Sequence, residues 1–147
     1  MGDARILPAE GRFEGRTHLF PVRVYFEDTD LSGVVYHANH LRWMERARSD
    51  MLLAAGIDQR AAFEAGEGAF AVADLAIRYR APARLGDALT VASRVTRVGA
   101  AVAIQQTVSR NAQIMSEAEV SVAFVAPNGR ARRQPSAWVA RFRSLVA

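Results

Sequence analysis

Residues 23–48 read RVYFEDTDLSGVVYHANHLRWMERAR, and this stretch says most about both the fold and the chemistry of the chain. It starts as the polar end of a strand, passes through a small-residue turn at Ser32 and Gly33, and enters an amphipathic helix. This order brings carboxylates and the free N–H groups of a helix start to one small space. An ionised carboxylate can attack a carbonyl or activate water, and a helix N-terminus stabilises negative charge on a carbonyl oxygen. The stretch therefore predicts an acyl-transfer site.

Hydrophobic periodicity on either side of the turn predicts a strand and a helix. Val22, Val24 and Phe26 alternate with polar or aromatic residues, which is the period of a half-buried strand. From residue 37 to residue 55 the apolar residues instead fall at helical spacing, and Gly56 is a natural stop. A weaker helical stretch covers 58–65. The first of these helices is the long element around which the fold is expected to form.

The second half of the chain reads as β structure. Four runs alternate in hydrophobicity with short connections between them, which favours an antiparallel meander; they lie at about 73–80, 89–95, 102–108 and 118–124. With the strand before the turn, five strands and one long helix predict an α+β domain whose sheet covers the helix. We expect a single domain over 17–147 after a loosely ordered segment at 1–16.

Composition excludes several classes of chemistry. The 147 residues contain no Cys, so a thiol nucleophile, a disulfide and a Cys-zinc site are excluded. They contain no Lys, which excludes Schiff-base chemistry and a Walker lysine. No apolar run is long enough for a membrane helix, and the N-terminus lacks the apolar core of a secretory signal. These features predict a cytoplasmic protein.

The net charge of +4 is spread unevenly, because the chain has no acid after Glu119. The arginines that follow are Arg130, Arg132, Arg133, Arg141 and Arg143. We interpret this basic C-terminal tail as solvated and partly ordered, with contact to an anionic ligand as the alternative. Nucleic-acid binding would need interleaved aromatic residues or a recognised fold, so no nucleic-acid partner is predicted.

Three stretches together resemble a known family, and they read VRVYFEDTDLSGVVYHANHLRWMERARSDML, IRYRAPARLGD and SEAEVSVAFV. The chain resembles the hotdog-fold acyl-CoA thioesterases of the 4-hydroxybenzoyl-CoA thioesterase type, above all the bacterial branch associated with the Tol–Pal cell-envelope system. The resemblance implies one long central helix wrapped by a five-stranded antiparallel sheet. It also implies hydrolysis of an acyl-CoA thioester without a metal or other cofactor.

The resemblance assigns roles to residues of the first stretch. The family's catalytic aspartate falls on Asp30, as nucleophile or as general base on water. The carbonyl-polarising backbone amide falls on His37, whose side chain is a further candidate participant. Gly33 matches the glycine of the tight turn, and Tyr36 with His37 matches the Tyr-His pair of the Tol–Pal-associated branch.

Each acidic or nucleophilic candidate also has a purely structural interpretation. Asp30 could cap the turn, because Asp is favoured before helices and in tight turns. Asp28 is expected to hydrogen-bond nearby backbone. Glu45 is interpreted as a partly buried ion-pair member that holds the helix. Ser32 lacks the context of a serine hydrolase.

Two further groups leave alternatives open. His37 and His40 are spaced i, i+3 and could bind a metal together with an aspartate, but we favour the amide role for His37 and a surface or interface position for His40. Arg78, Arg80 and Arg84 either lie on a solvated sheet face or bind the phosphates of CoA.

These observations predict an acyl-CoA thioesterase that forms a homodimer or a homotetramer. The alternative is a non-catalytic module that binds acyl thioesters or acyl carrier protein. The hydratase branch of the hotdog fold needs a helix-borne dyad in a motif that this chain lacks.

Overall fold

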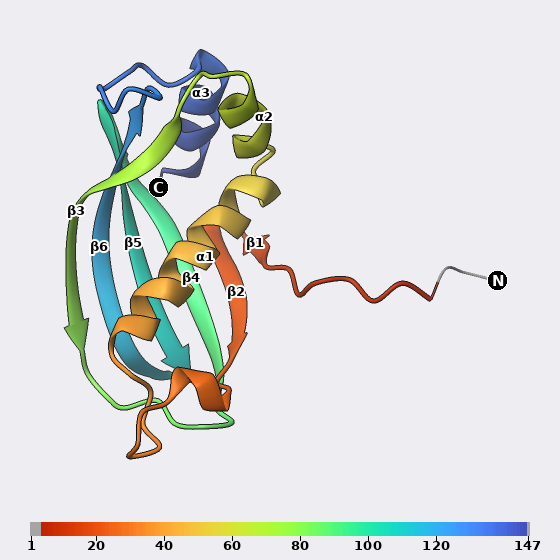
Figure 1. Cartoon of the computed structure of the whole chain (residues 1–147), viewed down its shortest axis with the longest axis vertical. Helices are drawn as coiled ribbons and strands as arrows, with labels where there is room; N and C mark the ends of the chain where they lie inside the picture. The colour runs from red at the N-terminus through yellow and green to blue at the C-terminus, as the bar shows by residue number, and fades with distance from the viewer. Residues whose placement is uncertain (1–3, 147) are drawn as a thin grey trace.

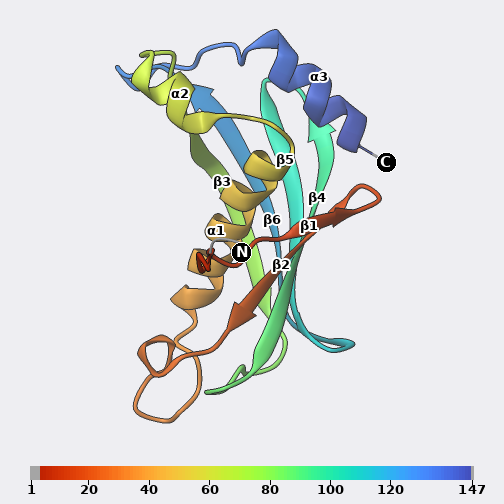
Figure 2. The same cartoon turned by 90° about the vertical axis from the view of Figure 1, so that its right-hand side faces the viewer.

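The computed structural model describes residues 4–146, which form one antiparallel sheet curved around a central helix (Figure 1). The strands are β1 (Arg12–Glu14), β2 (Thr17–Arg23), β3 (Ala69–Tyr79), β4 (Ala88–Val98), β5 (Ala101–Arg110) and β6 (Gln113–Val125). The helices are η1 (Phe26–Asp28), α1 (Ala38–Ala54), α2 (Gln59–Glu64) and α3 (Ser136–Leu145). In Figure 2 the sheet curves past one side of α1. The expected α+β class and the wrapped central helix are confirmed.

The helix α1 is buried along the stripe that the sequence predicts. Met44, Ala47 and Met51 are at most 1% exposed and pack against the sheet. Burial of a Met side chain typically contributes ~1.5–3 kcal/mol. The helix ends where Gly56 takes φ +82°. There the N–H of Ile57 donates to the carbonyl of Leu52 at 2.9 Å, which is the bonding pattern of a glycine-terminated helix.

The strand order is β1-β2-β4-β5-β6-β3, and it differs from a simple meander. β4, β5 and β6 are successive neighbours, but β3 pairs with β6 instead of β4. The expected four-strand meander is therefore wrong for β3. Alternating hydrophobicity in the sequence indicates which face of a strand is buried, but it does not indicate which other strand pairs with it. The connection from β3 to β4 crosses the end of the molecule that also holds the turn before α1 (Figure 1).

A sixth strand, β1, lies inside the segment expected to be loosely ordered. It forms a hairpin with β2 through a turn at Gly15, where φ is +61°. The hairpin is pinned to α1 because Nε2 of the fully buried His18 lies 2.8 Å from Oδ2 of Asp50. The same carboxylate oxygen accepts the N–H of Gly11 at 2.9 Å. Residues 11–14 are thus ordered, and the expectation for 1–16 does not hold there; residues 1–3 lie outside the described part of the chain.

The basic tail also differs from the expectation, because it ends in the docked helix α3. Phe142 and Leu145 of α3 are 1% and 5% exposed. Trp138 packs against Phe70 and Phe124 with ring centroids 5.7 and 5.5 Å apart. The apolar residues of α3 recur at helical spacing, as Trp138, Phe142 and Leu145. The arginines between them obscure this pattern in the sequence. None of the helices within 4–146 has the length and apolar character needed to cross a membrane.

Candidate active site

The turn that precedes α1 is held rigidly by backbone hydrogen bonds. Thr29 and Val35 form an antiparallel bridge, and the N–H of Asp30 donates to the carbonyl of Val34 at 2.9 Å. Gly33 has φ +79°, a conformation that side chains rarely adopt. Val35 is buried and donates its N–H to the carbonyl of Ala83 at 2.8 Å, which ties the turn to the β3–β4 connection.

Asp30 lies exposed on this turn with one carboxylate oxygen engaged. Its Oδ1 accepts the N–H of Ser32 at 2.8 Å and the hydroxyl of Ser32 at 2.5 Å. These bonds, the hydroxyl first, lower the pKa of Asp30 because they stabilise the charged form. Within residues 4–146, no hydrogen bond reaches Oδ2. The carboxylate is therefore ionised at neutral pH and presents one unengaged oxygen.

The start of α1 lies next to this turn and presents an open N–H group. The carbonyl of Asp28 accepts the N–H of Tyr36 at 2.9 Å and the side-chain amide of Asn39 at 2.8 Å, so turn and helix are joined. His37 is the helix-capping residue, and its N–H makes no hydrogen bond to any residue from 4 to 146. An unengaged N–H at the positive end of a 17-residue helix can bind an oxygen that carries developing charge. Asp28 has the structural role expected of it, since its side chain also accepts the N–H of Tyr25.

Aromatic side chains surround the helix start. The ring of His37 meets Tyr36 edge-on with centroids 4.6 Å apart, and the hydroxyl of Tyr79 donates to the carbonyl of His37 at 2.7 Å. His40 is 3% exposed and is buried within the single chain, so the expectation of a surface or interface position is wrong. Its Nδ1 lies 2.7 Å from the hydroxyl of Ser116. Burial, together with the charge of His37, lowers the pKa of His40 to about 4, so the imidazole is neutral at pH 7.

Two further expectations from the sequence concern a shared metal site and the ion pair of Glu45. Residues 4–146 hold no cluster of three or more His, Cys, Asp or Glu side chains that could share a metal ion. Glu45 is exposed, contrary to the expected partial burial, and its charge acts on Arg48 of the same helix. The buried cation of the helix is instead Arg48, whose Nη1 donates to Gln106 at 2.9 Å. Neither Arg48 nor Gln106 was singled out from the sequence, because a buried arginine paired with an amide leaves no local pattern.

The three arginines assigned to CoA differ in availability. Arg80 is committed to an ion pair with Glu117, which lies on the adjacent strand. Arg84 is exposed and forms a backbone bridge with Val34, so it lies beside the turn that carries Asp30. Arg78 is exposed on β3. Arg84 is therefore the best placed of the three to meet a substrate at the turn.

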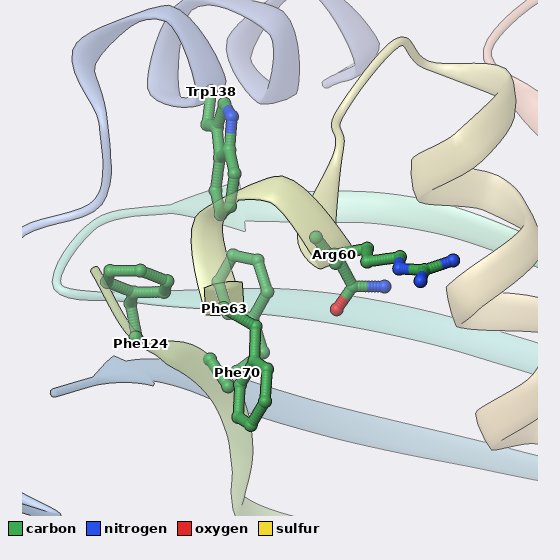
Figure 3. Close-up of a pocket in the computed structure, with 8 residues that line it drawn as sticks. Arg60, Phe63, Phe70, Phe124 and Trp138 are labelled. Carbon is green, nitrogen blue, oxygen red and sulfur yellow. The ribbon is translucent and has the colours of Figure 1, made fainter. Parts of the chain in front are cut away.

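Hollows in the surface lie beside the turn and at the far end of the molecule. A groove of about 1000 Å³ runs between α1 and β2 and reaches Asp28 and Asn39. A cavity of about 290 Å³ lies at the opposite end, where Figure 3 shows Phe63, Phe70, Phe124 and Trp138 around it. Asp30 lines neither hollow. The site is thus an open surface in a single chain.

Comparison with known proteins agrees with this architecture. The family model described as the thioesterase-like superfamily matches residues 24–142, which include the turn, α1 and the whole of β3 to β6. The chain belongs to this superfamily. The resemblance to the hotdog thioesterases is confirmed, and the chain is a thioester hydrolase.

The relatives of this thioesterase cover most of its length. It is 46% identical over 107 residues to the acyl-CoA thioesterase YbgC of Haemophilus influenzae, which is 72% of this chain and 79% of that protein. It is 41% identical over 127 residues to the acyl-CoA thioester hydrolase YbgC of Escherichia coli O6:H1, which is 84% of this chain and 94% of that protein.

Solved structures show the same fold for this thioesterase. A probable thioesterase from Bartonella henselae superposes with a TM-score of 0.76 at 33% identity, covering 81% of this chain and 99% of that chain. The 1,4-dihydroxy-2-naphthoyl-CoA thioesterase Slr0204 from Synechocystis superposes with a TM-score of 0.80 at 25% identity, covering 86% and 96%. The sheet has six strands, one more than the expected five, because of the short β1. The strand expected at Val22 to Phe26 lies earlier, at Thr17–Arg23, and Phe26 begins η1 instead.

Proposed function

We propose that this thioester hydrolase cleaves acyl-CoA to a free acid and CoA, with Asp30 and His37 as its catalytic residues. The observation that carries the proposal is the joined turn and helix start. It presents an ionised carboxylate with one unengaged oxygen and a helix N–H without a partner. The names of the two YbgC relatives support acyl-CoA as the substrate.

In the proposed reaction the thioester carbonyl oxygen accepts the N–H of His37. As general base, Asp30 takes a proton from water while the water oxygen forms a bond to the carbonyl carbon. The carbon–sulfur bond then breaks, and the CoA thiolate leaves and takes up a proton. As nucleophile, Asp30 would instead bond to the carbonyl carbon and displace the CoA thiolate, which takes up a proton. Water would then cleave the mixed anhydride to the free acid and the Asp30 carboxylate. An amide in the position of His37 is typically worth ~3–4 kcal/mol of barrier.

The test is Asp30→Asn, assayed by release of the CoA thiol across a panel of acyl-CoA substrates. Loss of the carboxylate is expected to lower kcat by about 10²–10⁴-fold, because that is the usual contribution of a general base. Asp58→Asn is the matched control, since Asp58 caps α2 by accepting the N–H of Ala61 and Asn caps equally well. Unimpaired turnover by Asp30→Asn would reject the catalytic assignment. The panel also reports the preferred acyl group, and acyl carrier protein thioesters extend the panel to the other proposed partner.

The substrate contacts are proposals of the same kind. We place Gly33 and Tyr36 at the acyl thioester, because they flank the turn and the helix start. Arg78, Arg80 and Arg84 are proposed to meet the CoA phosphates, with Arg84 as the principal contact. Arg84→Ala is expected to raise KM several-fold with little change in kcat, since a phosphate contact acts equally on bound substrate and transition state.

We further propose that the enzyme works as a homodimer or homotetramer. β3 is the last strand of the sheet, and such an edge presents unpaired backbone groups. Residues 71–74 of β3 are exposed, and Val72 is 50% exposed. A second copy of the chain that pairs with β3 would hydrogen-bond the unpaired backbone groups of this edge strand. It would also enclose the open site. A cytoplasmic location and a role beside the Tol–Pal system follow the resemblance, and cell fractionation tests the location.

A further inference from the structure

The first turn of α1 is fastened to the sheet at two points, and both fastening residues belong to one cross-strand pair. Tyr79 of β3 and Ser116 of β6 are partners in register at the end of their ladder. Tyr79 bonds to His37, and Ser116 bonds to His40. Because residues three apart on a helix lie on the same face, this single pair holds one complete turn of α1.

The outer fastening is the hydroxyl of Tyr79, which donates to the carbonyl of His37 at 2.7 Å. The pKa of Tyr79 is raised, first by burial and then by Tyr36, so the hydroxyl stays protonated. The ring of Tyr79 also meets the imidazole of His40 edge-on, with centroids 5.2 Å apart. The peptide group that follows His37 is therefore fixed from the side of β3.

The inner fastening is the contact between His40 and Ser116, which are 3% and 0% exposed. Within residues 4–146, Nδ1 of His40 is the one hydrogen-bond partner of the Ser116 hydroxyl. A buried hydroxyl and a neutral imidazole nitrogen at this distance share one hydrogen bond, and the tautomer of His40 sets which of the two donates.

We propose that Tyr79, His40 and Ser116 are positioning residues that aim the N–H of His37 at the thioester oxygen. This inference rests on the proposed function, because it assigns to three residues the placement of the amide named there. They touch the helix turn and act through it. Removal of any of their hydrogen bonds would let the helix start move relative to Asp30, whose turn is held by separate bonds to Val34 and Ser32.

The experiment compares Tyr79→Phe and Ser116→Ala, each of which removes one hydroxyl. Both are expected to lower kcat for thiol release about tenfold with KM within about twofold, since a displacement near 1 Å costs up to ~100-fold in rate. His40→Asn keeps an amide group that can hydrogen-bond to Ser116 and is expected to retain most of kcat. His40→Leu cannot make that bond and is expected to match Ser116→Ala.

Two control variants separate positioning from general damage. Ser93→Ala removes another fully buried hydroxyl, which accepts from Gln106 at 2.9 Å beside the middle of α1. Tyr25→Phe removes an exposed phenol on the chain before the turn. Both controls are expected to keep kcat within about twofold, and thermal melting of every variant checks the fold.

The outcomes are distinct. Wild-type kcat in Tyr79→Phe overturns the inference, and this variant carries the test even if Ser116→Ala does not fold, because its hydroxyl lies at the surface. Equal loss of kcat in Ser93→Ala, or a change confined to KM, also overturns it. If Asp30→Asn is inactive while Tyr79→Phe and Ser116→Ala are unaffected, the positioning role fails and the proposed function stands. If Asp30→Asn is fully active, the proposed function itself fails.

Discussion

Asp30 and Ser32 form a unit in which the serine hydroxyl stabilises the ionised form of the carboxylate that we propose to be catalytic. The two hydrogen bonds from Ser32 stabilise the ionised form, so the pKa of Asp30 lies below its ordinary value. A carboxylate with a lower pKa is a weaker base, but it is fully ionised over the whole neutral range. Ser32 thus makes the Asp30 carboxylate a weaker base and keeps its charge constant across the neutral pH range.

We predict that Ser32→Ala shifts the acid limb of the pH profile of kcat/KM to higher pH. Loss of the hydroxyl removes the largest influence that lowers the pKa of Asp30, so protonation inactivates the enzyme at a higher pH. The profile is measured by thiol release, with Ser49→Ala as the control for an exposed serine on α1. An acid limb that stays in place would show that another group sets it.

His40 makes a second prediction at the residue scale, this time for stability. Its pKa is about 4 in the folded chain and near 6.5 when unfolded. The folded state therefore favours the neutral ring. The neutral buried ring of His40 thus contributes to the free energy of unfolding. This contribution is fully present above pH 6.5 and is lost as the pH falls towards 4. The loss by pH 4.5 is on the order of 2 kcal/mol.

The measurement is urea unfolding at pH 7 and pH 4.5 for the wild-type chain and His40→Asn, which cannot titrate there. The wild-type chain should lose more free energy of unfolding between the two pH values than the variant. Equal losses would mean that His40 does not carry this pH dependence. The buried His18, whose pKa is also lowered by burial, is present in both proteins and cancels in the comparison.

At the scale of elements, α3 completes the core at the end remote from the turn. Phe142 is 1% exposed and meets the ring of Phe70 at 5.9 Å. We predict that Phe142→Ala lowers the free energy of unfolding by about 3–5 kcal/mol, the usual cost of deleting a buried aromatic side chain. Arg143→Ala, on the exposed side of the same helix, should change it by less than about 0.5 kcal/mol. Urea unfolding measures both, and a small effect of Phe142→Ala would mean that α3 is dispensable.

Local patterns predict α1 and its flanking turn well because the signals are contiguous in sequence. The helical stripe through Met44 and Met51, and the glycines at both ends, each specify a local conformation. The partner of β3 and the burial of His40 depend on residues far along the chain, such as Ser116, and no window of sequence contains both members. The site was therefore predictable in the residues of one segment, and its support from Tyr79 and Ser116 was not.

At the scale of the whole molecule, the exposed edge at β3 makes assembly testable. We predict that Val72→Asp weakens self-association and lowers activity together, because a charge on the edge strand opposes pairing with a second copy. Leu53→Asp, at a residue 71% exposed near the end of α1, is the control. Sedimentation velocity at micromolar concentration reports the association state. A wild-type chain that sediments as a monomer would contradict the proposed dimer.

The two ends of α1 are anchored by unrelated parts of the chain. At one end the Tyr79–Ser116 pair fastens the first turn of α1, next to the loop that carries Asp30. At the other, Nε of Arg141 donates to the carbonyl of Ala55 at 3.0 Å, and its guanidinium lies 5.7 Å from the ring centre of Phe13. Evolution or engineering can consequently change the resistance to unfolding at the Arg141 end without altering the contacts that hold the first turn of α1, whereas a substitution at His40 affects both rate and stability.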